Sequence, residues 1–469
     1  MPVSSIDVAH FATGHVVNDG TRASAAPAIL DTLAVLVAGS GEKLVLKLAR
    51  SLPVSLDPGA RPSFRTGELH RPDDIALLYG TAAHALDLDD VSMLAICHPS
   101  APVLAALLAV APWDSLTGPE LCQAHAIGTE VMIRMGQAIG FRHYEMGFHS
   151  TATLGVFGAT AALARLLKLD AGTTANALAI AASLASGLRL NFGSMVKPLH
   201  VGIAAANAVR AIEWANAGVE ASRGDLFVQG GVLDTFSGGL QVEWPDAVGL
   251  GTPFAIQSPG FERKRYPCCY LLHKIIALGL EAGRDGICLD DVAQFRIEMP
   301  NGGTRPLIHP RPTSGNEARF SGPYALVAAI HDGDVNFASF TDAAVTRPGI
   351  CARLADVTIA EVGDISLSAE EIGAATVRLD LRLTDGSTRR YARDAAPGSP
   401  DDPITPAELR AKWIDCFGRV RPDRMAAHAA ALHDDGVAAL SDGPLSGWLN
   451  AIWGDLWAEN TSTDRRITK

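Results

Sequence analysis

GFHSTATLGVFGATAALARLL, residues 147–167, is the segment around which we expect the fold of this chain to form. It predicts a long helix with Ser150 or Thr151 as its N-cap residue and with almost no polar face. Such a helix is buried in the core of a large soluble protein, since a membrane span needs about 20 apolar residues. His149 stands directly before the cap. It is either a hydrogen-bonded core residue or part of an anion site, because the start of a helix attracts negative charge.

The same arrangement occurs at two other predicted helices. In CHPSAPVLAALLAVA (97–111), His98 precedes Ser100 as the expected N-cap residue. In GSMVKPLHVGIAAANAVRAI (193–212), Lys197 precedes Pro198, a favourable first helical residue. Three basic side chains at three positive helix ends would form a strong anion site if they converge, so the pattern predicts a site for a small anionic substrate.

Composition limits the functions open to the chain. Its 469 residues are 48% hydrophobic and 19% charged, enough for a large core in two or three domains. A net charge of −12 argues against a nucleic-acid partner, although a basic cleft can still bind an anionic substrate. The first residues, MPVSSIDVAH, do not resemble a secretion signal, and no apolar run reaches the length of a membrane span. The seven cysteines lack CxxC spacing. We therefore expect a cytoplasmic protein that does not contact a membrane.

The order of patterns along the chain predicts a mainly α fold with an inserted α+β domain. Residues up to about 250 form successive apolar segments of helical length, such as 26–39, 75–90, 119–140 and 173–188. After Pro267 the sequence pattern changes to short runs that alternate in polarity or are rich in β-branched residues, as in strands. The segment TVRLDLRLTDGSTRRYAR (376–393) predicts a hairpin with its turn at Asp385–Gly386. Helices return after Thr405, a plausible N-cap residue. We predict a large all-helical domain from 1–265 and 400–469 and a smaller α+β lid domain from 266–399.

Acidic residues crowd the segment between two of these helices. Asp87, Asp89 and Asp90 lie at the C-terminal end of the helix predicted at 75–90, where negative charge is disfavoured, so they require partners such as His98, Lys197 or an ion. Asp87 with His98 would form a carboxylate–imidazole pair suited to proton transfer. The alternative is a solvated acidic terminus.

Further candidates lie beyond residue 260. In FERKRYPCCYLLHK (261–274), Lys264 or Arg265 could bind a substrate carboxylate, and His273 lies in the first turns of a predicted helix. The usual role of such a charge run is a solvated surface. Tyr324 opens another helix after Gly-Pro, where a packing role is the simpler interpretation. Signatures for nucleotide binding, zinc proteolysis or serine hydrolysis (GxGxxG after a strand, a P-loop, HExxH, GxSxG) do not occur.

Six ordered segments of the chain resemble the MmgE/PrpD family, which contains 2-methylcitrate dehydratase, cis-aconitate decarboxylase and iminodisuccinate epimerase. They are AHALDLDD with HPSAPVL, GFHSTATLGVFGAT, NFGSMVKPLHVG, YPCCYLLH, ARFSGPYA and APGSPDDP. The resemblance implies a helical domain with an α+β lid, usually as a homodimer. It also implies a decarboxylase-like site made of Asp87, His98, His149, Lys197, His273 and Tyr324. Val91 departs from the family, since relatives commonly have Thr there, and this argues against cis-aconitate or 2-methylcitrate as the substrate.

The reactions of this family make or quench a carbanion next to a carboxylate. They need a tuned acid or base, cations that hold carboxylates, and donors that spread developing charge. The resemblance therefore implies a lyase that needs neither cofactor nor metal, with His98, His149, His273, Asp87 and Tyr324 as catalytic residues. Lys197 and Lys264 would bind the carboxylates of a small di- or tricarboxylate. An epimerase and a non-catalytic carboxylate-binding protein stay open as alternatives.

Overall fold

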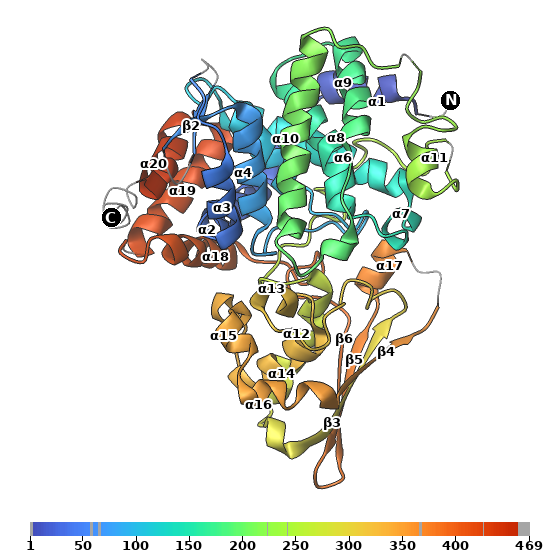
Figure 1. Cartoon of the computed structure of the whole chain (residues 1–469), viewed down its shortest axis with the longest axis vertical. Coiled ribbons are helices and arrows are strands. Elements are labelled where there is room, and N and C mark those ends of the chain that lie inside the picture. Colours follow the sequence, from blue (N-terminus) through green and yellow to red (C-terminus); the bar gives the residue numbers. More distant parts are fainter. Residues whose placement is uncertain are drawn as a thin grey trace. The chain divides into compact units, whose positions relative to one another are not determined.

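The computed structural model of the chain describes residues 3–56, 60–63, 67–222, 224–241, 243–364, 368–424 and 426–457. These residues are mainly helical with a small mixed sheet, as the sequence predicts for the fold class. They divide into two units (Figure 1). Unit 1 comprises Met1–Leu188, Pro198–Phe261 and Thr405–Lys469, and unit 2 comprises Arg189–Lys197 and Glu262–Ile404.

Unit 1 is a bundle of helices with one short strand pair. Its elements are α1 (Ser5–Gly14), α2 (Asp19–Gly39), α3 (Lys43–Ser51), β1 (Arg61–Pro62), β2 (Leu69–His70), α4 (Pro72–His84), α5 (Ser100–Val110), α6 (Gly118–Ile139), α7 (Arg142–Glu145), α8 (Ser150–Leu166), α9 (Ala171–Leu184), α10 (Val196–Asn216), α11 (Val232–Ser237), α18 (Pro406–Val420), α19 (Ala426–Asp442) and α20 (Ser446–Trp457). The first two residues of α10 belong to unit 2.

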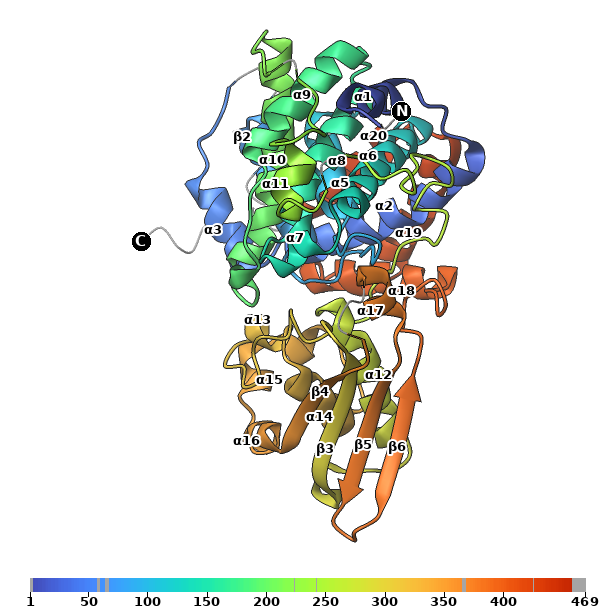
Figure 2. The ribbon, with the colours of Figure 1, turned by 90° about the vertical axis from the view of Figure 1, so that its right-hand side faces the viewer.

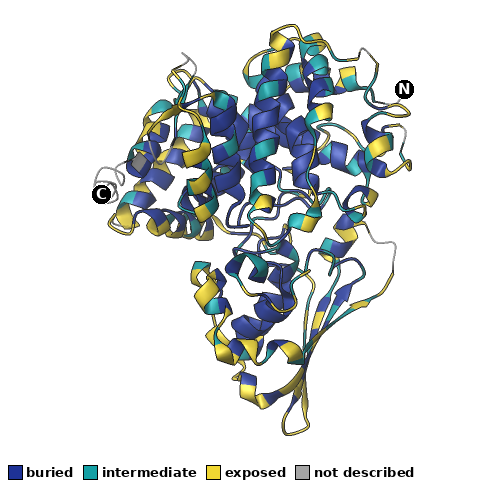
Figure 3. Ribbon diagram, viewed as in Figure 1, coloured by how far each residue is buried: buried dark blue, intermediate teal, exposed yellow. Residues whose placement is uncertain are grey.

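Helix α8 is the predicted buried helix, and it packs against α5, α6 and α9. Its glycines explain how closely the neighbours approach. A Cβ atom on Gly158 would lie 2.7 Å from the backbone oxygen of Gly128 in α6, and one on Gly155 would lie 3.0 Å from the Pro102 ring of α5. In Figure 3 the central helices of this unit are buried along most of their length. Close backbone packing thus fixes the starts of α5 and α8 relative to each other.

The expectation that no apolar run reaches membrane length is wrong for α2. This helix has 21 residues and is long and apolar enough to cross a membrane by length and composition, but 72% of its apolar window is buried inside the protein. It packs against α4, α6, α18 and α19 as a core helix. Asp31 in its middle is fully buried and pairs with Lys412 of α18 at 2.7 Å. The C-terminal helices therefore complete the core of the unit to which the first helices belong.

Two predicted helix ends in unit 1 are also corrected. The helix predicted at 75–90 ends at His84, because Asp87 adopts a left-handed backbone conformation with φ of 53°. The helix predicted at 173–188 spans Ala171–Leu184. By contrast, Thr405 caps α18 as expected, with its side chain accepting a hydrogen bond from the Glu408 backbone.

Unit 2 combines a four-stranded sheet with helices. Its longer elements are α12 (His273–Arg284), β3 (Val292–Pro300), α14 (Gly322–Asp332), β4 (Val357–Val362), α17 (Ala369–Ala374), β5 (Val377–Leu383) and β6 (Thr388–Arg393). Shorter helical turns are α13 (Gly315–Ala318), α15 (Asp342–Val345) and α16 (Pro348–Cys351). The strand order is β4-β3-β5-β6, with β3 and β4 parallel and the other neighbours antiparallel (Figure 2).

The predicted hairpin forms at the edge of this sheet. β5 and β6 pair from Val377↔Arg393 to Arg382↔Thr388, and Gly386 takes a positive φ of 86° in the turn. Alternate residues of β5 are buried, because α12 packs against β5 and β6. The hydrophobic core of unit 2 is built from α12, α14 and the inward side chains of β3 and β5.

Candidate active site

The acidic segment after α4 folds back on itself to join α5. His84 is the last residue of α4, and the chain turns through Asp87 and a short bridge between Ser92 and Cys97 before it reaches His98. Ser100 then begins α5. The end of one helix and the start of the next thus bring two histidines and two aspartates together in unit 1.

Asp89 is the centre of this cluster and is fully buried. Both of its carboxylate oxygens lie 2.9 Å from Nδ1 of His84, and one lies 3.2 Å from Nδ1 of His98. On the other edge of the His98 ring, Nε2 lies 3.7 Å from Oδ1 of Asp87. The expected contact between Asp87 and His98 is therefore present, but Asp89 is the closer carboxylate to the imidazole.

Burial alone raises the pKa of Asp89. The neighbouring imidazoles of His84 and His98 outweigh this effect and hold the pKa well below the usual range of a carboxyl group. Asp89 is therefore an ionised carboxylate in the interior of the unit, where only charge-assisted partners can compensate for lost hydration.

Asp90 has a different environment from its neighbour. It accepts hydrogen bonds from the backbone N–H and hydroxyl of Ser100, and Nε2 of His125 lies 2.9 Å from the same hydroxyl. Asp90 thus caps α5, whereas the sequence predicted Ser100 itself as the N-cap residue. The physical reason is that Pro99, at the N-cap position, has no side-chain acceptor. Burial raises the pKa of Asp90 to about 7 and lowers that of His125 to about 3, so both groups tend toward their neutral forms.

His149 is the N-cap residue of α8, one position before the expected cap. Its Nδ1 lies 3.2 Å from Nδ1 of His200 in α10, and its ring stacks with His84 at a centroid distance of 6.0 Å. The N–H of its backbone donates to the carbonyl of Gly187, where a Cβ atom would lie 2.5 Å from Ala152 and 3.4 Å from the His200 ring. Glycine is required at position 187 because of the close approach of Ala152 and the positive φ of 133°.

A hydrogen bond joins the starts of α5 and α8. The backbone N–H of His98 donates to Oγ1 of Thr151 at 3.0 Å. The rings of His84 and His98 are 4.4 Å apart, so His84 lies between His98 and His149. The structure thus brings together Asp87, His98 and His149 of the predicted site residues.

The other predicted site residues belong to unit 2. Lys197 is buried, with its ammonium 5.2 Å from the ring centroids of both Phe192 and Phe320. Lys264 is completely buried. Whether these lysines meet the histidine cluster stays a prediction, but Lys197 and His200 are three residues apart in α10 and therefore lie on one face of that helix.

His273 and Tyr324 are also buried in unit 2. His273 lies beside the rings of Tyr266 and Tyr270, with Nδ1 3.2 Å from the carbonyl oxygen of Pro397. Tyr324 is part of the hydrophobic core, where its hydroxyl donates to the carbonyl of Ser339. Burial raises the pKa of Tyr324 to about 12. Their predicted catalytic roles remain predictions.

Four side chains of the cluster have donor atoms close enough to hold a metal ion. One donor atom each from His84, Asp87, Asp89 and His98 lies within 4.8 Å of the others. Two imidazoles and two carboxylates suit a divalent transition metal. The same four groups also contact one another directly, since Asp89 accepts a hydrogen bond from His84 and lies 3.2 Å from Nδ1 of His98. We interpret the cluster as hydrogen-bonded ion pairs.

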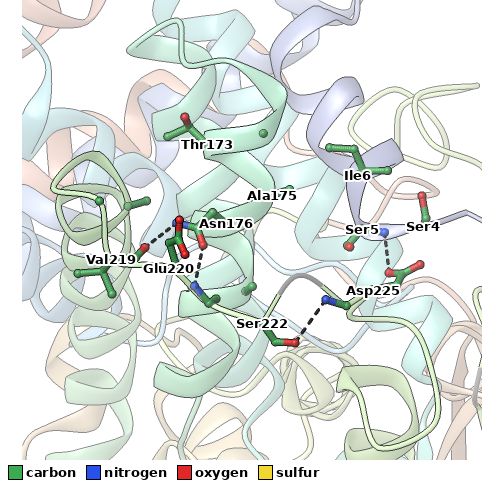
Figure 4. Close-up of a pocket in the computed structure, with 16 residues that line it drawn as sticks. Ser4, Ser5, Ile6, Thr173, Ala175, Asn176, Val219, Glu220, Ser222 and Asp225 are labelled. Atoms are coloured by element: carbon green, nitrogen blue, oxygen red, sulfur yellow. Dashed lines mark hydrogen bonds between the residues drawn. The ribbon is translucent and has the colours of Figure 1, made fainter.

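A pocket of about 610 Å³ lies elsewhere in unit 1, between the start of α1, helix α9 and the segment after α10 (Figure 4). Its described lining includes Asn176, whose side chain bonds to the backbone of Val219 and Ala221, and two acidic residues, Glu220 and Asp225. None of the predicted site residues is among that described lining. The pocket therefore does not support the predicted carboxylate site.

Comparison with known protein families matches two long segments of the chain. Residues 7–245 match the MmgE/PrpD N-terminal domain, and residues 266–435 match the MmgE/PrpD C-terminal domain. The chain belongs to the MmgE/PrpD family.

Relatives of this MmgE/PrpD chain include proteins named cis-aconitate decarboxylase. The one from Homo sapiens is 27% identical over 353 residues, covering 73% of this chain and 72% of the relative. The one from Mus musculus is 28% identical over 401 residues, with 82% and 80% covered. The one from Aspergillus terreus is 26% identical over 387 residues, with 77% and 78% covered. The similarity therefore extends over most of each protein.

The sequence patterns of this MmgE/PrpD chain do not single out three residues that the structure places around His98 and His149, namely His84, Asp89 and His200. Asp89 was noted among the acidic residues but not assigned a role, and His84 and His200 were not considered. Both histidines carried a signal in their spacing. His84 lies three residues before Asp87, and His200 lies three residues after Lys197 on the same helix.

Proposed function

We propose that the chain is a lyase, either a decarboxylase or a dehydratase, that acts on a small di- or tricarboxylate without a cofactor or metal ion. The observation that carries this proposal is the buried cluster in which His98 contacts two carboxylates while His149 pairs with a second imidazole. Membership of the MmgE/PrpD family and similarity to proteins named cis-aconitate decarboxylase support it.

The chemistry requires one proton to move at a carbon next to a carboxylate. In decarboxylation, the C–C bond to the departing carbon dioxide breaks, its electron pair passes to the neighbouring carbon, and a protonated imidazole delivers a proton there. In dehydration, a neutral imidazole removes the proton and an acid protonates the departing hydroxyl group. His98 or His149 performs the transfer in either reaction, and a positioned acid or base contributes about 10²- to 10⁴-fold in rate.

Cationic groups hold the substrate in this proposal. Lys197 is one helical turn from His200 on α10, and His200 contacts His149. The first backbone N–H groups of α8 add positive potential beside His149. The family resemblance supports Lys264 as the residue that binds a second carboxylate and His273 and Tyr324 as further catalytic residues.

The substrate is expected to differ from cis-aconitate in the group that would meet Val91. This side chain is buried and follows Asp90 directly in the sequence, at a position where the family resemblance implies Thr. Without the threonine hydroxyl, the site loses a hydrogen bond to the substrate, and such a loss strongly changes which substrate the site prefers. We therefore propose a related unsaturated or hydroxylated di- or tricarboxylate.

A panel of such acids in heavy water tests the proposal. The expected result by NMR and gas detection is either release of carbon dioxide with one deuterium in the product, or loss of water without deuterium in the product. Deuterium exchange with racemisation, and without loss of water or carbon dioxide, would instead identify an epimerase. Saturable binding by calorimetry without turnover of any acid would identify a carboxylate-binding protein. Either of these two results would refute the lyase.

We also propose a cytoplasmic homodimer. Two observations support the dimer. Several helices of unit 1 are rich in alanine and glycine, and the family resemblance implies a homodimer. Light scattering at micromolar concentration should give a mass of about twice 49.2 kDa. A mass of one chain would contradict the dimer without affecting the proposed chemistry.

A further inference from the structure

We infer that Asp89 is the positioning residue of the site, which fixes the imidazoles of His84 and His98 with a proton on each Nδ1 and so prepares His98 as the proton donor. This inference rests on the proposed lyase function for its kinetic consequences. Its structural content, the tautomer of two rings, can be measured without any substrate.

The geometry identifies the tautomers. An ionised carboxylate is an acceptor only, so any hydrogen bond between Asp89 and an imidazole must use an N–H of the ring. Nδ1 of His84 lies 2.9 Å from both oxygens, and Nδ1 of His98 lies 3.2 Å from one of them. Nδ1 therefore carries the proton in His84, whereas Nδ1 of His98 contacts Asp89 by charge and outside hydrogen-bond geometry. The negative charge of Asp89 still favours a proton on that nitrogen, so Nε2 is the atom through which each ring exchanges a proton.

The two carboxylates around His98 define its role. Asp89 contacts its Nδ1 edge, and Asp87 lies 3.7 Å from its Nε2 edge. A nearby negative charge stabilises an imidazolium ion. His149 differs, because its Nδ1 faces another imidazole nitrogen, that of His200, at 3.2 Å, and one of those two nitrogens must be an unprotonated acceptor. Groups whose environments push their protonation apart serve as acid and base, so His98 is the donor and the His149–His200 pair supplies the acceptor.

Asp90 provides a matched control for Asp89. It is the next residue and is equally buried, but it accepts hydrogen bonds from the backbone N–H and hydroxyl of Ser100 and not from a histidine ring. An asparagine at either position removes one carboxylate from nearly the same place in unit 1. A general loss of packing or charge balance would therefore affect both variants, whereas a loss of ring positioning would affect Asp89→Asn alone.

Steady-state kinetics on the acid found in the panel give the first test. We expect Asp89→Asn to lower kcat by between about 10²- and 10⁴-fold with little change in KM, since a wrong tautomer disables a proton transfer. Asp90→Asn should stay within about threefold of the unchanged chain. In a His98→Gln background, Asp89→Asn should have little further effect, because residues that act through one another are not additive. Equal losses in both backgrounds would refute the inference.

Histidine side-chain NMR gives the second test and needs no activity. Long-range proton–nitrogen spectra of the full chain with labelled histidine distinguish Nδ1–H from Nε2–H rings, and His84→Gln and His98→Gln assign the two signals. Both rings should show protonated Nδ1, and Asp89→Asn should remove that pattern while Asp90→Asn preserves it. Nε2–H tautomers at both rings in the unchanged chain would overturn the inference. The expected tautomers together with no turnover of any acid would uphold Asp89 as the positioning group and refute the proposed lyase instead.

Discussion

Lys412→Met should destabilise unit 1 because it leaves a carboxylate buried without its cation. The ammonium of Lys412 lies 2.7 Å from Oδ1 of Asp31, which is completely buried in α2, and the Lys412 side chain is only 10% exposed. The same ammonium donates to the carbonyl oxygen of Leu88 at 2.9 Å. Leu88 separates Asp87 from Asp89, so one lysine stabilises both the core helix and the segment that carries the site.

The magnitude follows from this burial. Removing one member of a buried ion pair costs about 3–5 kcal/mol, and a backbone carbonyl left without its donor adds about 1 kcal/mol. Replacing both charges, as in Asp31→Leu with Lys412→Met, should restore most of that loss, because no isolated charge remains. The single and double variants together therefore predict a coupling energy of several kcal/mol.

Urea unfolding followed by tryptophan fluorescence measures this effect in the appropriate unit, since all seven tryptophans belong to unit 1. Arg410→Ala is the control on the same helix, where the ion pair with Asp434 is exposed, and its midpoint should hardly change. The reasoning would be refuted by a loss below about 1 kcal/mol for Lys412→Met, or by single-variant losses that simply add in the double variant.

Four further results are expected. His98→Ala and His149→Ala should each lower kcat by about 10²- to 10⁴-fold in protein that still folds, and full activity in both would remove them from the mechanism. Lys197→Ala should raise KM much more than it lowers kcat, so an unchanged KM would argue against a carboxylate contact. The pKa of Asp90 is raised to about 7 in the folded chain, above its unfolded value, so its contribution to the free energy of unfolding should decline as pH rises from about 4 to 7. That decline should be absent in Asp90→Asn. The same pH dependence of the free energy of unfolding in this variant and in the unchanged chain would contradict the role of Asp90. Finally, treatment with EDTA should leave turnover intact, and activity lost to EDTA but regained with one metal ion would reverse the proposed metal independence.

The fold class could be predicted because its signals are local. An apolar segment with no polar face, as at 147–167, has few alternatives to a buried helix, and alternation around Asp385–Gly386 has few alternatives to a hairpin. Helix ends were less certain. Asp87 ended the helix predicted at 75–90 through a backbone conformation that sequence patterns do not encode.

The sequence by itself determined the family, through six ordered segments, and it determined that His98 and His149 stand at the starts of buried helices. Only the tertiary structure decided which carboxylate meets which ring. Asp87, Asp89 and Asp90 are alike in sequence, yet one faces the edge of His98, one lies between two imidazoles and one caps α5. Hydrogen bonds and charge interactions fall off within a few ångströms, so the direction of each side chain in the folded segment sets its partner and its protonation.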